Sequence, residues 1–234
     1  MKPKTLKKLR KILFLIVVIF FIFIIIKLFP LFKGLTTPEG RASFSTRIEE
    51  LNLLGPFAII AMAICKVVVV FLPGEPIELL SGMCYGPLFG LIILYIGYTI
   101  SSFLIALAVK KFGMDLVNDV VPKDKLDKVQ KIINNNPKKI EFTLFVLYFL
   151  PVIPKDFLTY IGSLLPISIK KFLFISLCAR FPAVLSSTIV GSKILSGDIL
   201  TIVIVYGITY SISAIIAGIY NKFFSKDKRQ SKKL

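Results

Sequence analysis

The sequence predicts an all-α polytopic membrane protein: an inverted repeat with two opposed re-entrant helical hairpins plus about four full transmembrane helices. Three observations predict this fold: long apolar runs, basic clusters between them, and a proline pattern that occurs twice. Of the 234 residues, 56% are hydrophobic, and the mean hydropathy is +0.82. Soluble domains hold roughly 45–50% apolar residues. The excess lies in continuous runs, which places the chain in the membrane class.

The net charge of +17 is concentrated in the two termini and one central loop. Residues 1–11 carry six Lys or Arg, residues 110–139 carry eight Lys against four Asp, and residues 221–234 carry six Lys or Arg against one Asp. The positive-inside rule therefore places both termini and the central loop in the cytoplasm, with the chain in the plasma (inner) membrane. Basic tracts that flank membrane segments are expected to contact anionic lipid headgroups, not nucleic acid.

Several kinds of chemistry are not expected. The chain has no histidine, so imidazole bases and histidine metal ligands are excluded. Its cysteines, Cys65, Cys84 and Cys178, lie in apolar stretches without CxxC spacing and are interpreted as buried hydrophobic residues. No GxSxG or HExxH motif is present. We therefore expect neither a metal, a cofactor nor an enzymatic activity.

The first predicted element is a transmembrane helix at residues 12–29. Its 18 residues would span about 27 Å, close to the roughly 30 Å of the hydrocarbon core. No small-x-small cleavage site follows it, so it is interpreted as retained and not as a signal peptide. Together with an outer loop it forms a predicted N-terminal unit, residues 1–52.

The positions of the basic clusters then determine how many times the first half of the core can cross the membrane. The apolar blocks 54–72 and 83–109 lie between the first helix and the lysine-rich central loop. Two full crossings there would put that loop outside the cell, against the positive-inside rule. One full crossing and one re-entrant excursion from the outside satisfy the charges.

The second half follows the same logic and completes a predicted core at residues 53–198. The apolar run 142–150 gives only about 15 Å of helix, half a bilayer, and a short segment at 156–165 follows it. Full crossings are predicted at 168–192 and 199–221, the second within a C-terminal unit, residues 199–234, that ends in a basic cytoplasmic tail.

The central loop contains a predicted amphipathic helix. Apolar residues recur there at helical spacing with lysines between them: Leu126, Val129, Ile132 and Ile133. Such a helix could lie on the inner leaflet or could simply connect the two halves.

The proline pattern F-L-P-x-x-P-x-[E/D]-x-L occurs at residues 71–80 and again at 149–158, the first and second tip segments. Prolines break helices and explain the two turns, but they do not explain an acid at the same place in both copies, Glu78 and Asp156. Broken helices that meet at the midplane are common in transporters with inverted repeats. The residues predicted to shape the tips are Pro73, Gly74, Pro76, Pro151 and Pro154, with Gly82 and Gly162 following them.

Charged residues at predicted membrane depth form the candidate transport site, or polar core. Each charge in hydrocarbon costs at least about 2.5–3.5 kcal/mol and needs a partner or water. These residues could form structural ion pairs, Asp156 with Arg180 and Glu78 with Lys66. They could instead form a proton- or ion-linked site, or a basic centre that holds a lipid phosphate. The candidates are Glu75, Glu78, Lys155, Asp156, Arg180 and Lys66.

Two blocks resemble a known family. They are LPGEP at 72–76 with SGxxxGPxxG at 81–90, and LPxxPKDFLTYIG at 150–162 with FxxxxxxxRxP at 172–182. They resemble the DedA-like superfamily, also called the VTT or SNARE-associated Golgi protein domain, over roughly residues 55–195. The likeness is greater to the bacterial branch similar to the yeast late-Golgi vesicle protein.

The resemblance implies opposed re-entrant hairpins and lipid handling. Members scramble phospholipids or move undecaprenyl phosphate, with apparent ion coupling. The expected partners are therefore phospholipid or polyprenyl phosphate, and protons or sodium; a homo-oligomer is also possible. The chain departs from the better-studied bacterial pattern, which has arginines where Tyr148 and Pro154 stand here. The resulting hypothesis is a lipid translocator, with a proton or small-ion antiporter and a non-transporting scaffold as alternatives.

Overall fold

The computed structural model describes residues 54–70, 74–134, 140–149 and 154–230, with scattered positions between 37 and 52. The described part contains helices and no strand, which confirms the predicted all-α class. The predicted first helix, Pro73 and Pro151 lie outside the described residues. The helices are α3 (Leu54–Val69), α4 (Glu75–Phe112), α5 (Met114–Val120), α6 (Lys123–Asn134), α7 (Ile140–Phe149), α8 (Lys155–Ser163), α9 (Ile169–Ser196) and α10 (Ile199–Gln230).

Three of these helices, α4, α9 and α10, are long and apolar enough to cross a membrane. Their apolar spans cover Glu75–Phe112, Ile169–Ile194 and Ile199–Ile216. Helices α3 and α7 are apolar but have only 16 and 10 residues, about 24 and 15 Å, which is shorter than the hydrocarbon core. Large apolar side chains are exposed along the long helices, as expected where lipid is the solvent.

Helix α4 is bent, and the bend lies four residues beyond the glycine predicted to follow the first tip. Gly86 has φ 74° and ψ 177°, and Pro87 follows it. That backbone conformation is essentially restricted to glycine, and the proline cannot donate the backbone hydrogen bond that would continue the helix. The Ser81 hydroxyl donates to the Gly90 carbonyl across the bend at 2.9 Å, and this hydrogen bond stabilises the bend.

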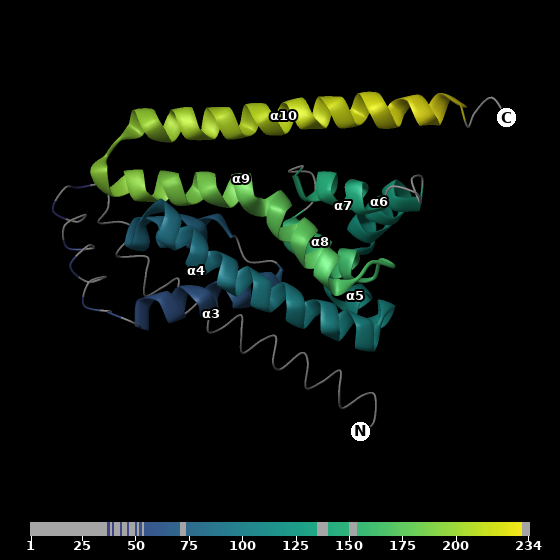
Figure 1. Cartoon of the computed structure of the whole chain (residues 1–234), viewed down its shortest axis with the longest axis horizontal. Coiled ribbons are helices and arrows are strands. Elements are labelled where there is room, and N and C mark those ends of the chain that lie inside the picture. Colours follow the sequence, from purple (N-terminus) through teal and green to yellow (C-terminus); the bar gives the residue numbers. More distant parts are fainter. Residues whose placement is uncertain are drawn as a thin grey trace, which may run out of the picture.

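Helices α4 and α9 form the main contact of the fold, and glycines let their backbones approach (Figure 1). A side chain at Gly82 of α4 would collide with the backbone of Thr188, and one at Gly191 of α9 with the backbone of Leu79. Small residues at such crossings are typical of membrane helix pairs. Gly82, predicted as a tip residue, therefore serves helix packing.

Helix α10 lies along α9 on one side of the molecule (Figure 1). No residue of its apolar span is buried inside the protein. Polar contacts attach it: the hydroxyls of Ser186 and Thr209 are 2.5 Å apart, and the Tyr206 hydroxyl donates to the Glu75 carboxylate at 2.7 Å.

The predicted amphipathic helix is α6, and its apolar face packs on the protein. Leu126, Val129 and Ile133 are buried and belong to the hydrophobic core, and α6 contacts α7 and α8. This arrangement favours the connecting-helix alternative, because the face that would have entered the leaflet already contacts protein.

Candidate functional site

The core of the protein contains a cluster of three charged side chains from three helices. Asp156 of α8 lies between Lys66 of α3 and Arg180 of α9. Its Oδ2 is 3.3 Å from the Lys66 ammonium and its Oδ1 is 3.1 Å from the Arg180 guanidinium. The three residues are 5%, 5% and 1% exposed. The predicted Asp156–Arg180 pair is thus confirmed, and we call these three residues the buried charge cluster.

Helix ends position two members of the buried charge cluster. Lys66 lies in the last turn of α3, and Asp156 lies in the first turn of α8, two residues after Pro154. A helix carries partial positive charge at its N-terminus and partial negative charge at its C-terminus. Each charge therefore lies at the helix end that stabilises it. The predicted break at Pro154 sets the start of α8, which places Asp156 in the first turn of that helix.

Arg180 is held by more than its ion pair. Its Nη2 donates to the Lys155 carbonyl at 3.1 Å and to the Thr159 hydroxyl at 2.7 Å. Its guanidinium carbon lies 5.4 Å from the ring centre of Tyr98 and 5.3 Å from that of Tyr148. Two aromatic faces and several oxygens thus replace water around a buried cation.

Glu78 is linked to the buried charge cluster through Tyr98. The Tyr98 hydroxyl donates to Glu78 Oε1 at 2.8 Å, and the Lys66 ammonium lies 5.0 Å from the centre of the same ring. The predicted Glu78–Lys66 ion pair is wrong, because Lys66 reaches Asp156 instead. Tyr98 therefore contacts both Glu78 of the first tip segment and Lys66, and Lys66 in turn pairs with Asp156 of the second tip segment.

The remaining predicted residues have different surroundings. Glu75 is exposed and accepts a hydrogen bond from Tyr206 of α10. Gly74 lies under the Lys66 side chain, and a Cβ there would occupy the space of the lysine Cε and Nζ. A Cβ at Gly162 would press on Phe172 and Leu144. Gly74 therefore makes room for the buried lysine, whereas Gly162 serves core packing.

A cavity of about 600 Å³ joins the two tip segments. Its wall includes residues at the end of α3, at the start of α4 and at the start of α8, together with Pro122 and Lys125 of the central loop. Six of its eleven lining residues are charged, and we call it the polar-core cavity: Lys66, Glu75, Glu78, Lys125, Lys155 and Asp156. The described parts of both tips thus open into one polar space on the side of the central loop.

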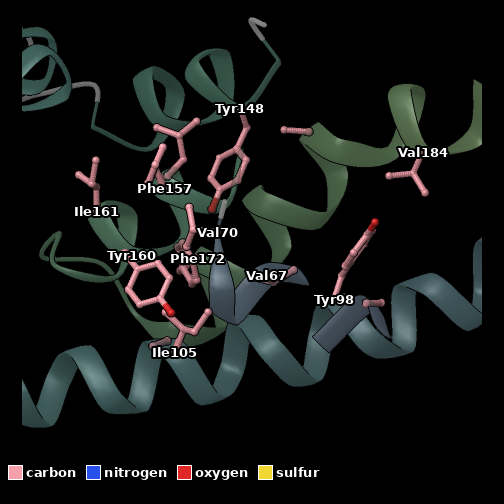
Figure 2. Close-up of a cluster of buried hydrophobic side chains, with 14 of the residues drawn as sticks. Val67, Val70, Tyr98, Ile105, Tyr148, Phe157, Tyr160, Ile161, Phe172 and Val184 are labelled. Atoms are coloured by element: carbon pink, nitrogen blue, oxygen red, sulfur yellow. The ribbon is translucent and has the colours of Figure 1, made fainter. Parts of the chain in front are cut away.

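Sequence reasoning did not identify the two tyrosines whose rings lie next to the Arg180 guanidinium. Figure 2 shows Tyr98 and Tyr148 among the buried side chains. Both tyrosines are fully buried, and the Tyr148 hydroxyl donates to Thr159 at 3.2 Å. Thr159 could have been found, because it lies three residues after Asp156 and so on the same helical face. A tyrosine in an apolar helix carries no comparable signal.

The comparison with protein families matches a region that includes most of these residues. A family model described as the VTT domain matches residues 72–193, which contain both Asp156 and Arg180 as well as Glu78. Lys66 lies just before the matched region. No solved structure matches the chain significantly.

Proposed function

The chain belongs to the VTT-domain family, and from that premise we propose that this membrane protein moves lipids between the leaflets of the plasma membrane. The activity would be that of a scramblase or of an ion-coupled lipid transporter. The substrate class is phospholipid or polyprenyl phosphate. Both termini would be cytoplasmic, as the basic clusters indicate.

We infer the architecture of an inverted repeat for this activity. Helices α3 and α7 are too short to span a bilayer, and each ends at a tip segment. Residues from the described part of both tip segments, Gly74 and Lys155 among them, line the same cavity. Two re-entrant arms that enter from opposite faces would bring the tips together in this way, and irregular backbone at that depth needs a polar cavity.

The observation that carries the proposal is the charge imbalance of the buried charge cluster beside the polar-core cavity. Lys66 and Arg180 share a single carboxylate, that of Asp156. The cavity wall adds Lys155 against two glutamates, and Lys125 is paired with Asp124 at 3.9 Å, so the excess of positive charge lies in the buried charge cluster. An uncompensated charge in a membrane interior is costly. A lipid phosphate in the cavity would supply the missing negative charge while its chains remain in the bilayer.

The test is lipid redistribution in proteoliposomes, with two aspartate variants compared. Asp156→Asn should abolish movement of headgroup-labelled phospholipid or of polyprenyl phosphate. Asp198→Asn is the matched control: Asp198 lies in the loop between α9 and α10, where the hydroxyl and the backbone N–H of Thr201 donate to it and lower its pKa. Both variants remove one carboxylate. Equal activity of the two variants, or no movement by the wild type, would contradict the proposal.

Proton or small-ion antiport is the second candidate, and Glu78 favours it. Both Asp156 oxygens face cations, whereas the Glu78 carboxylate accepts a hydrogen bond from the Tyr98 hydroxyl and lines the polar-core cavity. Glu78 is the carboxylate better placed to exchange a proton with water. Ion flux lost in Glu78→Gln, without lipid movement in the wild type, would select this alternative. Full cellular function of Glu78→Gln combined with Asp156→Asn would instead favour a scaffold.

A further inference from the structure

A second cavity, of about 510 Å³, lies between the first turns of α7 and α9. It shares no lining residue with the polar-core cavity. We call it the interfacial groove, and its lining residues are Glu141, Phe142, Lys170, Lys171, Phe174 and Ile175. None of these residues belongs to the buried charge cluster or lines the polar-core cavity, so the interfacial groove has no role in the function proposed above.

The polar side of the interfacial groove carries excess positive charge. Lys171 makes an exposed ion pair of 2.8 Å with Glu141, which ties the first turn of α9 to that of α7. Lys170 is exposed, and the structure gives it no ion pair among the described residues. One carboxylate therefore faces two ammonium groups, and the groove has a net charge of about +1 at neutral pH.

The other side of the interfacial groove is apolar and exposed. Phe142 is 57% exposed and Phe174 is 70% exposed. Phe174 lies four residues after Lys170 and three after Lys171, so it is on the same helical face and about 5 Å further along the axis. The lysines directly precede most of the apolar span of α9. This order places ammonium groups at headgroup depth and the aromatic rings at the level of the first acyl carbons.

We propose that the interfacial groove binds an anionic phospholipid of the surrounding leaflet. The phosphate lies against Lys170 and Lys171, and an acyl chain runs along Phe142 and Phe174. A net positive charge beside a lipid-exposed apolar surface is complementary to a headgroup with one negative charge. A bound lipid would hold α7 and α9 together at their first turns and so stabilise the fold.

The experiment uses the purified full chain in neutral detergent. Phosphatidylglycerol and phosphatidylcholine with the same acyl chains are added separately, and the shift in the unfolding temperature is followed. Phosphatidylglycerol should stabilise the wild type in a saturable way and phosphatidylcholine should do so much less. Each lysine near an anionic headgroup should account for about a five-fold change in apparent affinity, so Lys170→Gln with Lys171→Gln should weaken binding about 25-fold.

Matched variants separate the groove from general attraction to basic surfaces. Lys110 and Lys111 form another exposed lysine pair, at the end of α4, and changing both to Gln should weaken phosphatidylglycerol binding far less than the groove variant does. Phe174→Ser should weaken binding while both lysines remain, and inorganic phosphate should not stabilise the wild type. An equal loss in the two lysine-pair variants, an unchanged affinity in the groove variants, or stabilisation by inorganic phosphate alone would overturn the proposal.

Discussion

The Asp156 carboxylate is the shared partner of two buried cations, so its loss should lower the free energy of unfolding by an amount that can be estimated. Asp156→Asn keeps the shape of the side chain but leaves Lys66 and Arg180 without a negative partner at 3.3 and 3.1 Å. Breaking a buried pair by removing one member costs about 3–5 kcal/mol, because the remaining charge is stranded. We expect that loss in the free energy of unfolding, measured by detergent-induced denaturation in mixed micelles.

A second substitution tests whether stranded charge is the cause. Lys66→Met alone leaves a balanced Asp156–Arg180 pair, so its cost should be smaller, about 1–2 kcal/mol. Combined with Asp156→Asn it removes one stranded cation, so the double variant should be more stable than the sum of the two single effects implies. A loss below about 1 kcal/mol for Asp156→Asn, or strict additivity of the two substitutions, would refute this reasoning.

Further predictions concern the helix contacts. Gly82→Val should lower the free energy of unfolding by about 3 kcal/mol, because it forces α4 away from α9. Gly207→Ala, in open space on α10, should instead stabilise the helix by about 0.5–1 kcal/mol. Equal effects of the two substitutions on the free energy of unfolding would contradict the packing role of Gly82. Gly86→Ala should cost about 1–3 kcal/mol because its φ is 74°, and an unchanged unfolding midpoint would argue against the bend. Tyr206→Phe should remove the bond to Glu75 and cost about 0.5–1.5 kcal/mol, with faster amide exchange at the start of α10; unchanged exchange would contradict its attachment.

The course of the long helices could be predicted from sequence, and their bends could not. Continuous apolar runs led to crossings at 168–192 and 199–221, and the structure has α9 and α10 there. The bend of α4 lies inside such a run, so hydropathy gives no sign of it. The Gly86-Pro87 pair was the available signal, because glycine permits the unusual φ and proline prevents a regular continuation.

The candidate site could be predicted in its charges but not in all of its pairs. Burial forces Asp156 to find a cation, and Arg180 was the cation at similar depth. Whether Lys66 pairs with Glu78 or with Asp156 depends on how α3 is rotated and on where the chain turns at Gly74. The spacing of residues in the sequence does not determine either. Tyr98 and Tyr148 resemble lipid-facing aromatic residues in sequence, and only the fold shows that they enclose Arg180.

The most direct test of the proposed lipid translocation is a leaflet-accessibility measurement on the wild-type protein. Proteoliposomes contain a trace of headgroup-labelled phospholipid or of labelled polyprenyl phosphate, and a membrane-impermeant quencher is added from outside. We predict that the quencher reaches the label of both leaflets with at least one of the two lipids, and that Asp156→Asn restricts quenching to the outer leaflet. Quenching confined to the outer leaflet for the wild type with both lipids would contradict the account.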